Sequence, residues 1–120
     1  MPATNDALSR NLSREQEITI SVTGRKSGRT ISTPVWFIFE GGKVTLLPVK
    51  GSDTQWYKNV LKKPSLKIEA RGAEGEFHIT PVKDPNQVSS VVEKFREKYG
   101  AGDVKKYYSK FDVAVLAEPR

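Results

Sequence analysis

The chain has 120 residues, a net charge of +6 from 20 Lys and Arg against 14 Asp and Glu, and no cysteine. This length corresponds to one domain, which can bury a core without disulfides or a structural metal. The lack of cysteine excludes disulfides, thiol nucleophiles and thiolate metal sites, and the single His78 gives little support to a metal centre or a Ser-His-Asp triad. The positive charge favours anionic partners, such as phosphorylated small molecules, acidic lipid or nucleic acid.

The N-terminal segment is polar. We interpret residues 1–14 as a tail with room for one short helix, and residues 15–120 as a single domain. The tail lacks the apolar stretch of a signal peptide, and no run in the chain approaches the roughly 20 apolar residues of a membrane span. We therefore expect a cytoplasmic protein without a membrane span.

Three strands are predicted in the first part of the chain. Residues 16–23 alternate between apolar and polar side chains, and residues 24–29 form a glycine-bounded turn. Residues 30–40 are predicted as one strand. Its apolar centre at 35–39 indicates that both faces are covered, and a second subunit is a candidate for one of the two covers. A Gly-Gly turn at 41–42 leads into a third strand at 43–49.

A helix and two further strands are predicted next. Ser52 or Asp53 can cap a helix that Pro64 ends. Residues 65–71 form a strand, residues 72–75 a turn, and the next strand places His78 on the surface or on a dimer face.

The strongest helix signal lies at residues 85–99. Asp84 is its predicted N-cap, Gln87 completes a capping box, and Gly100 ends it. A short helix or turn at 103–109 and a last strand at 111–117 follow. The whole pattern predicts a mainly β (α+β) fold, an antiparallel barrel with two to three helices packed outside it.

The turn at residues 24–29 is a candidate anion site. Arg25, Lys26 and Arg29 supply charge, Ser27 supplies a hydroxyl donor, and glycines such as Gly28 let backbone N–H groups form an anion-binding nest. The alternative is an ordinary solvated basic hairpin.

A second candidate segment follows the third strand. Lys50 and the start of the next helix can hold an anionic group, and Trp56 can wall a flat ring system. Packing is the alternative role for Trp56, and also for Tyr107 and Tyr108, which can line a substrate pocket. No side chain is predicted to be catalytic, since a hydride-transferring flavin carries the chemistry itself.

The order of these features resembles the deazaflavin-dependent nitroreductase family. The resemblance covers residues 16–71: strand, Gly-Arg-Lys-Ser-Gly-Arg turn, strand with Pro-Val-Trp, Gly-Gly hairpin, strand, Lys-Gly, Trp-Tyr-Lys-Asn and Lys-Pro. Members are small split β-barrel oxidoreductases that are related in fold to pyridoxamine phosphate oxidases. The resemblance therefore implies a split antiparallel β-barrel.

The resemblance also implies a cofactor, either coenzyme F420 or FMN, and a set of cofactor-binding residues. The family holds the phosphate and anionic tail with the basic turn and with the lysine after the third strand, and it places the ring beside the second strand and the helix start. The matching residues are Arg25, Lys26, Ser27, Gly28, Pro34, Val35, Trp36, Val49, Lys50, Gln55 and Trp56. Where members read Pro-Arg after the turn, this chain has Thr30 and Ile31, so one phosphate cation is missing and Arg29 is the candidate to replace it.

The implied activity is hydride transfer to a small organic acceptor such as a quinone, a nitro compound or an enone, by a homodimer. Two alternatives stay open: an FMN-binding barrel of the same fold, and a non-catalytic module that binds a pigment or nucleic acid. We expect no nucleic-acid partner, because the aromatic residues do not interleave with the cations along an exposed strand.

Overall fold

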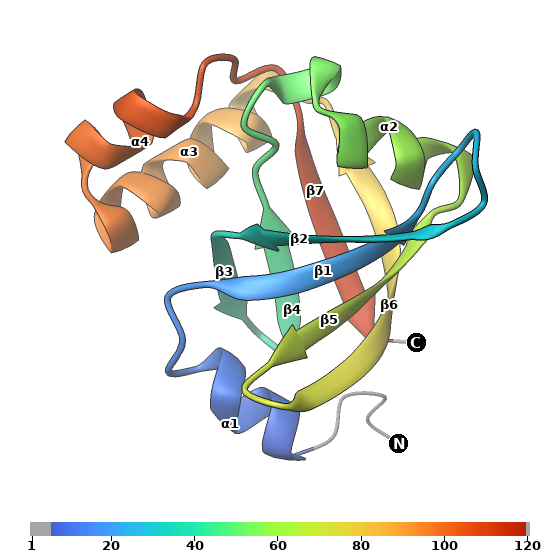
Figure 1. Cartoon of the computed structure of the whole chain (residues 1–120). Helices are drawn as coiled ribbons and strands as arrows, with labels where there is room; N and C mark the ends of the chain where they lie inside the picture. The colour runs from blue at the N-terminus through green and yellow to red at the C-terminus, as the bar shows by residue number, and fades with distance from the viewer. Residues whose placement is uncertain (1–5, 120) are drawn as a thin grey trace.

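The computed structural model describes residues 6–119 of the chain. Within these residues the fold combines one sheet with four α-helices and one 3-10 turn, arranged as drawn in Figure 1. In chain order the elements are α1 (Asp6–Leu12), β1 (Ile18–Thr23), β2 (Thr30–Val35), β3 (Phe37–Glu40), β4 (Lys43–Leu46), η1 (Gly51–Asp53), α2 (Gln55–Lys62), β5 (Ser65–Ala70), β6 (Ala73–Val82), α3 (Pro85–Tyr99), α4 (Ala101–Tyr107) and β7 (Ala114–Pro119).

The seven strands form one antiparallel sheet in the order β2-β1-β5-β6-β7-β4-β3. The two ends of this order, β2 and β3, are consecutive in the chain and are separated by Trp36 alone. Because one residue joins the two edges, the sheet has to curl back on itself, as Figure 1 shows. This confirms the predicted split antiparallel barrel with flanking helices.

The prediction of one strand over residues 30–40 is wrong. The chain breaks at Trp36 because its two halves pair with different partners, β2 with β1 and β3 with β4. The Phe37 peptide at the break is held from α3: the Tyr99 hydroxyl accepts from Phe37 N at 3.0 Å, and Lys98 Nζ donates to Phe37 O at 2.8 Å. Burial lowers the pKa of Lys98.

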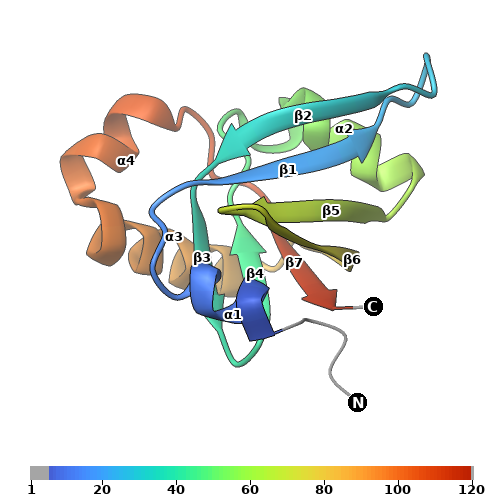
Figure 2. The same ribbon diagram turned by 60° about the horizontal axis from the view of Figure 1, so that its bottom comes forward.

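Both faces of β3 are covered, as predicted, but the second cover comes from this chain. Phe37 is buried inside the barrel, whereas Ile38 packs with a separate cluster that includes Val92 and Phe95 of α3 and Val104 of α4. Figure 2 shows α3 beside β3 and β4. Burial of residues 35–39 therefore requires no second subunit.

The N-terminal helix α1 is part of the packed core. Leu8 and Leu12 are fully buried against the sheet, and Asn11 Nδ2 donates to Ala70 O at 2.8 Å. Gly75 of β6 lies so close that a Cβ there would meet Leu8 Cδ2 at 3.0 Å. The short helix was allowed by the sequence, but residues 6–12 pack into the domain and do not form a tail.

Helix α3 follows its prediction. Asp84 Oδ2 accepts from Gln87 N at 3.2 Å, and Gly100 follows the helix with φ 95°. Val88, Val92 and Phe95 form the buried face. Local signals were enough here because the cap and the apolar stripe lie within one continuous segment.

Other boundaries differ from the predictions. Residues 51–53 form the 3-10 turn η1, and Thr54, not Ser52 or Asp53, is the N-cap position of α2. The last strand is shifted from residues 111–117 to Ala114–Pro119. β6 begins at Ala73, inside the predicted turn of residues 72–75. No helix within residues 6–119 is long and apolar enough to cross a membrane.

Candidate functional site

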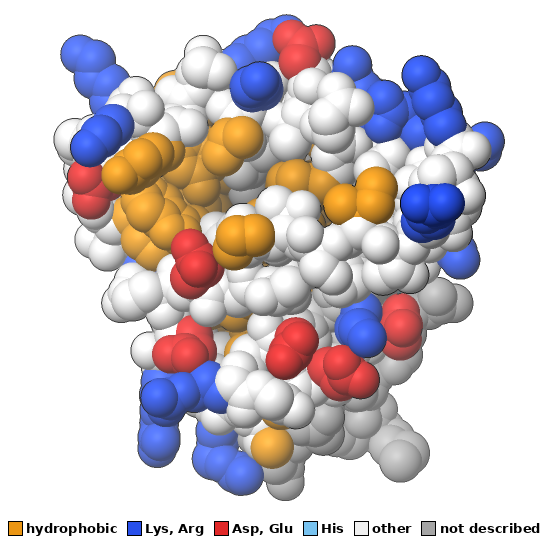
Figure 3. Space-filling model, viewed as in Figure 1, with side chains coloured by type: hydrophobic (Ala, Val, Ile, Leu, Met, Phe, Trp, Pro, Cys, Tyr) orange, Lys and Arg blue, Asp and Glu red, His pale blue; other side chains and the backbone are white. Residues whose placement is uncertain are grey.

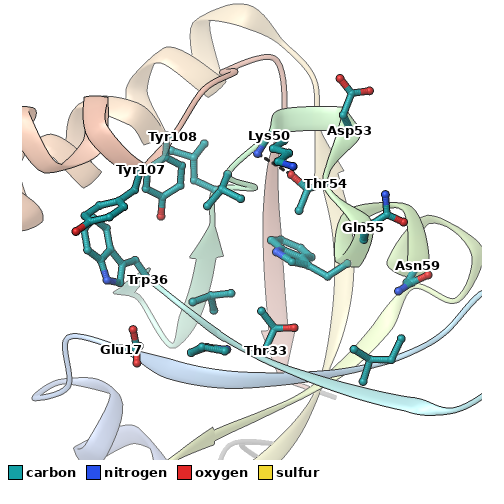
Figure 4. A pocket seen from close by; sticks show the side chains of 16 residues that line it. Glu17, Thr33, Trp36, Lys50, Asp53, Thr54, Gln55, Asn59, Tyr107 and Tyr108 are labelled. Carbon is teal, nitrogen blue, oxygen red and sulfur yellow. Dashed lines mark hydrogen bonds between the residues drawn. The ribbon is translucent and has the colours of Figure 1, made fainter.

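A cavity of about 640 Å³ opens between β2, the segment after β4, α2 and the end of α4 (Figure 4). β2, the stretch from the end of β4 to α2, and the end of α4 are separate in the sequence, and the curl of the sheet brings them together. The lining residues are Glu17, Ile31, Thr33, Pro34, Val35, Trp36, Leu47, Val49, Lys50, Asp53, Thr54, Gln55, Trp56, Asn59, Tyr107 and Tyr108.

One end of the cavity is aromatic. Trp36 stacks on Tyr99 with ring centroids 4.3 Å apart, and Tyr107 meets Trp36 edge-on at 5.5 Å. Tyr108 completes this wall, with its centroid 6.0 Å from that of Trp36. Burial strongly raises the pKa of Tyr108, so its hydroxyl stays neutral near pH 7.

The opposite wall is polar. Figure 4 shows Lys50, Thr54, Gln55 and Asn59 along one side of the cavity, facing the aromatic group. Thr54 Oγ1 accepts from Lys50 N at 2.8 Å, which fixes the backbone of Lys50 to the start of α2. A ligand in this cavity therefore meets aromatic rings at one end and hydrogen-bonding groups at the other.

The loop that carries Lys50 is clamped to the segment before β7. Ser52 N donates to Asp112 Oδ1 at 2.9 Å, and Lys110 Nζ lies 3.2 Å from Asp53 Oδ2 and 3.7 Å from Asp112 Oδ2. Desolvation opposes ionisation of Asp112, but the bonds from Ser52 and the charge of Lys110 hold its pKa below the usual value. The clamp fixes the rim on which Lys50 stands.

The basic turn at residues 24–29 lies beside the cavity and does not line it. Arg25 is bound to α2: its backbone N and its Nη1 both donate to Asn59 Oδ1, at 3.1 and 2.8 Å, and its Nη2 donates to Gln55 Oε1 at 2.9 Å. Lys62 Nζ donates to Arg25 O at 3.1 Å. The turn is thus fastened to the helix that forms the polar wall.

Several groups of the expected anion nest already have partners within the protein. Gly28 N donates to Gly24 O at 2.9 Å and Arg29 N to Ser27 Oγ at 3.2 Å. With Arg25 N bound to Asn59, three N–H groups of the turn are engaged. The side chains of Lys26 and Arg29 are exposed. In Figure 3 basic side chains stand over the β1–β2 turn and α2, beside a hollow flanked by hydrophobic side chains.

The structure brings most of the expected site residues into one cavity. The residues that line it are Pro34, Val35, Trp36, Val49, Lys50, Gln55, Trp56, Tyr107 and Tyr108, and those that do not are Arg25, Lys26, Ser27 and Gly28. Trp56 serves two roles, because it lines the cavity and is also buried in the barrel core.

Sequence reasoning missed seven lining residues: Glu17, Ile31, Thr33, Leu47, Asp53, Thr54 and Asn59. Thr33 shares a face of β2 with Ile31 and Val35, so the period of two could have identified it. Asn59 lies four residues after Gln55 on α2 and therefore on the same helix face, a spacing that was available in the sequence. Glu17 carried no comparable signal.

Tyr99 should make the stability of the protein fall at alkaline pH. The pKa of Tyr99 is raised to about 12. Burial is the largest cause; a hydrogen bond with the Phe37 backbone partly opposes it, and the charge of Glu17 adds to it. The unfolded pKa is about 10, so this stabilisation is complete below pH 10 and is lost as pH rises through 12. We expect the free energy of unfolding, measured with urea, to be about 1–2 kcal/mol lower at pH 11.5 than at pH 9, after allowing for the partial exposure of Tyr99.

The Tyr99→Phe variant should show a smaller loss between these two pH values, whereas Tyr107→Phe, at a 53% exposed position, should behave as the wild type. If Tyr99→Phe loses as much stability between pH 9 and pH 11.5 as the wild type, ionisation of Tyr99 does not cause the alkaline loss of stability.

Comparison with solved structures identifies the fold. An F420 reductase superposes with a TM-score of 0.71 at 16% identity, covering 98% of this chain and 96% of that chain. HutZ, the heme storage protein of Vibrio cholerae, superposes with a TM-score of 0.71 at 12% identity, covering 100% of this chain and 92% of HutZ. A structure described as a domain-swapped dimer superposes with a TM-score of 0.67 at 18% identity, covering 87% of this chain and 81% of that chain. These similarities establish the split-barrel fold, which hosts proteins of different function.

None of the curated proteins compared matches the chain in sequence. The family comparison, in contrast, matches residues 9–114, which span α1 to the start of β7. The chain therefore belongs to DUF2255, a family described as uncharacterized proteins conserved in bacteria.

Proposed function

We propose that this protein is a split-barrel oxidoreductase that binds coenzyme F420 or a flavin in the cavity and transfers a hydride to a small organic acceptor. The observation that carries the proposal is the cavity of about 640 Å³ with an aromatic end and a polar, Lys50-bearing end. A phosphorylated flat-ring cofactor has the same two-ended chemistry. The fold shared with an F420 reductase supports the proposal.

The residues present fit a flat ring. Pro34 and Val35 of β2 and Trp56 of α2 offer apolar surfaces along the cavity. β2 is an edge strand, and Pro34 has no N–H to leave unpaired there. A ring beside β2 would thus meet an apolar wall.

The bound cofactor would supply the hydride chemistry, and the protein would bind and orient it. Lys50 would attract an anionic group at the polar end, while Trp36, Tyr107 and Tyr108 would exclude water at the other end and present the acceptor. The neutral Tyr108 hydroxyl is available to hydrogen-bond an acceptor oxygen.

Oxidation of reduced F420 tests this function directly. With purified protein, we expect its absorbance to change in the presence of a nitroaromatic compound, a quinone or an enone, and not without protein. Parallel assays with reduced FMN identify which cofactor is used. No turnover with either cofactor and any of these acceptors would contradict the proposed activity.

Lys50 should contribute strongly to cofactor affinity. Lys50 lines the cavity, and among residues 6–119 its ammonium has no carboxylate partner. Loss of a charged hydrogen bond costs about 1.5–3 kcal/mol, so Lys50→Gln should weaken binding about 10- to 100-fold. Lys63→Gln removes the same charge just after α2, outside the cavity, and should leave the dissociation constant within about twofold, since exposed single charges contribute little. Equal effects of the two variants would exclude a specific role for Lys50.

A flavin in place of F420 is favoured by one feature of the cavity. Ile31, which stands where the related family has a phosphate cation, lines the cavity and is 43% exposed. A shorter anionic tail needs fewer cations than a long one. A yellow protein as purified, with a flavin absorbance spectrum, would support FMN.

We also propose a homodimer. The outer edge of β2 has no partner strand in the described chain, and Ile31 is exposed on it. Light scattering on the eluting protein should give about twice the chain mass of 13.4 kDa. A monomer at micromolar concentration would contradict this assembly.

A further inference from the structure

Two buried polar side chains stand out on the wall of the cavity. Among residues 7–119, Thr54 and Asn59 are the non-aromatic polar side chains that are buried, with exposed fractions of 6% and 4%. Both line the same cavity, on or next to α2. Buried polar groups normally have hydrogen-bond partners, so their bonding requires a full account.

The bonds of Arg25 determine the orientation of the Asn59 amide. Its backbone N–H and Nη1 both donate to one end of the amide, at 3.1 and 2.8 Å, and only an oxygen can accept both bonds. The amide nitrogen therefore occupies the other position. Its two hydrogens have no acceptor among the described residues.

Thr54 presents a second unused donor. Its Oγ1 accepts from Lys50 N at 2.8 Å, and within residues 6–119 its hydroxyl hydrogen has no acceptor. Lys50, another lining residue, adds a third donor side chain and a positive charge to this wall. Asp53, the nearby carboxylate on the rim, is paired with Lys110 at 3.2 Å.

These three groups share one chemical property: each has donor hydrogens that no acceptor among the described residues engages. Unpaired buried donors are unfavourable, and a ligand group with several oxygen lone pairs would supply acceptors for them. A hydroxyl or an amine on a ligand fits less well, because each also needs an acceptor. The arrangement selects an oxyanion, either a phosphate or a carboxylate.

We propose that Thr54 and Asn59, together with Lys50, form an oxyanion subsite inside the cavity, and that Arg25 is a positioning residue which holds the Asn59 amide in its donating orientation. This inference deepens the proposed function: it places the anionic group of the ligand in the cavity wall and not on the basic turn. Arg25 then acts through Asn59 and does not contact the anion.

The Asn59→Asp variant tests the subsite. It is nearly isosteric and keeps an oxygen for Arg25, but it replaces the donor with a second acceptor. We expect at least a tenfold loss of FMN and F420 affinity, with little change in riboflavin binding, because riboflavin lacks the phosphate. Asn86→Asp makes the same charge change on the exposed first turn of α3 and should bind like the wild type. Thermal melting of both variants controls for folding.

Titration of isotope-labelled protein with inorganic phosphate and with acetate tests the subsite without any cofactor. The Asn59 side-chain amide resonances should shift with at least one of these anions, and the responding anion identifies the class. Arg25→Ala removes the Nη1 bond and leaves only the backbone N–H to hold the Asn59 oxygen, so it should reduce this response, while Lys26→Ala should preserve it.

The outcomes separate this inference from the proposed function. Phosphate- or acetate-dependent shifts at Asn59 without binding of F420 or FMN would support the subsite and contradict the cofactor. Cofactor binding that is equally strong in Asn59→Asp and Asn86→Asp would overturn the subsite and leave the proposed function standing. Amide resonances that respond to neither anion, in a protein that binds no cofactor, would overturn both.

Discussion

Replacing Phe95 by alanine should lower the free energy of unfolding by about 3–5 kcal/mol. Phe95 is fully buried at the centre of the cluster between α3, α4 and the sheet. Its ring lies 5.8 Å from that of Tyr99 and 6.0 Å from that of Tyr108, so the substitution also removes support from the aromatic end of the cavity. Urea unfolding followed by circular dichroism measures the change.

Leu61→Ala provides the matched control for Phe95→Ala. Leu61 is 47% exposed on α2, so its truncation should cost less than about 0.5 kcal/mol. A loss below 1 kcal/mol in Phe95→Ala would mean that α3 and α4 are not packed on the sheet as described here.

The Gly51→Ala variant should lose about 2–4 kcal/mol of stability, since left-handed backbone strain and overpacking each cost a few kcal/mol or less. Gly51 has φ +55°, and a Cβ there would collide with Asp112 Oδ1. The clamp from Ser52 to Asp112 would have to open. Because Lys50 precedes Gly51, cofactor affinity should fall as well.

Two variants separate the causes of the Gly51→Ala effect. In an Asp112→Ala background the contact is absent, so Gly51→Ala should cost only the backbone strain, about 1–2 kcal/mol. Gly102→Ala, where a Cβ meets no atom within 4 Å, should be neutral or stabilising. An additive double variant would show that the close contact with Asp112 does not determine the cost.

The fold was predictable where its signals are local. The cap at Asp84, the apolar stripe of α3 and the stop at Gly100 lie within one segment and were read correctly. The break at Trp36 could not be predicted from the sequence, because it arises when β2 pairs with β1 while β3 pairs with β4. Residues 35–39 are apolar throughout, so their pattern contains no mark of the change of partner.

The packing of α1 was missed for a related reason. Among residues 7–12 only Leu8 and Leu12 enter the core, which is a weak amphipathic pattern in a polar segment. Their burial depends on the barrel end formed by β5 and β6, including the close approach at Gly75. No local feature of residues 6–12 reveals that surface.

The site was predictable in part. The lysine after the third strand and Trp56 were expected in one site, and both line the cavity. The composition of the basic turn indicated an anion site, but composition does not show that Arg25 binds Asn59 and Gln55. Partners 30 and 34 residues away in the chain depend on how α2 packs against β1.

The equilibrium binding of F420 and FMN to the purified wild-type protein decides whether the cavity is a cofactor site. Fluorescence polarisation of either cofactor, titrated with protein, should give a saturable increase with a micromolar or lower dissociation constant, and Lys50→Gln should shift it at least tenfold. Polarisation of both cofactors that stays at the free value up to about 100 μM protein would contradict the account, since that limit corresponds to about −5.5 kcal/mol of binding free energy.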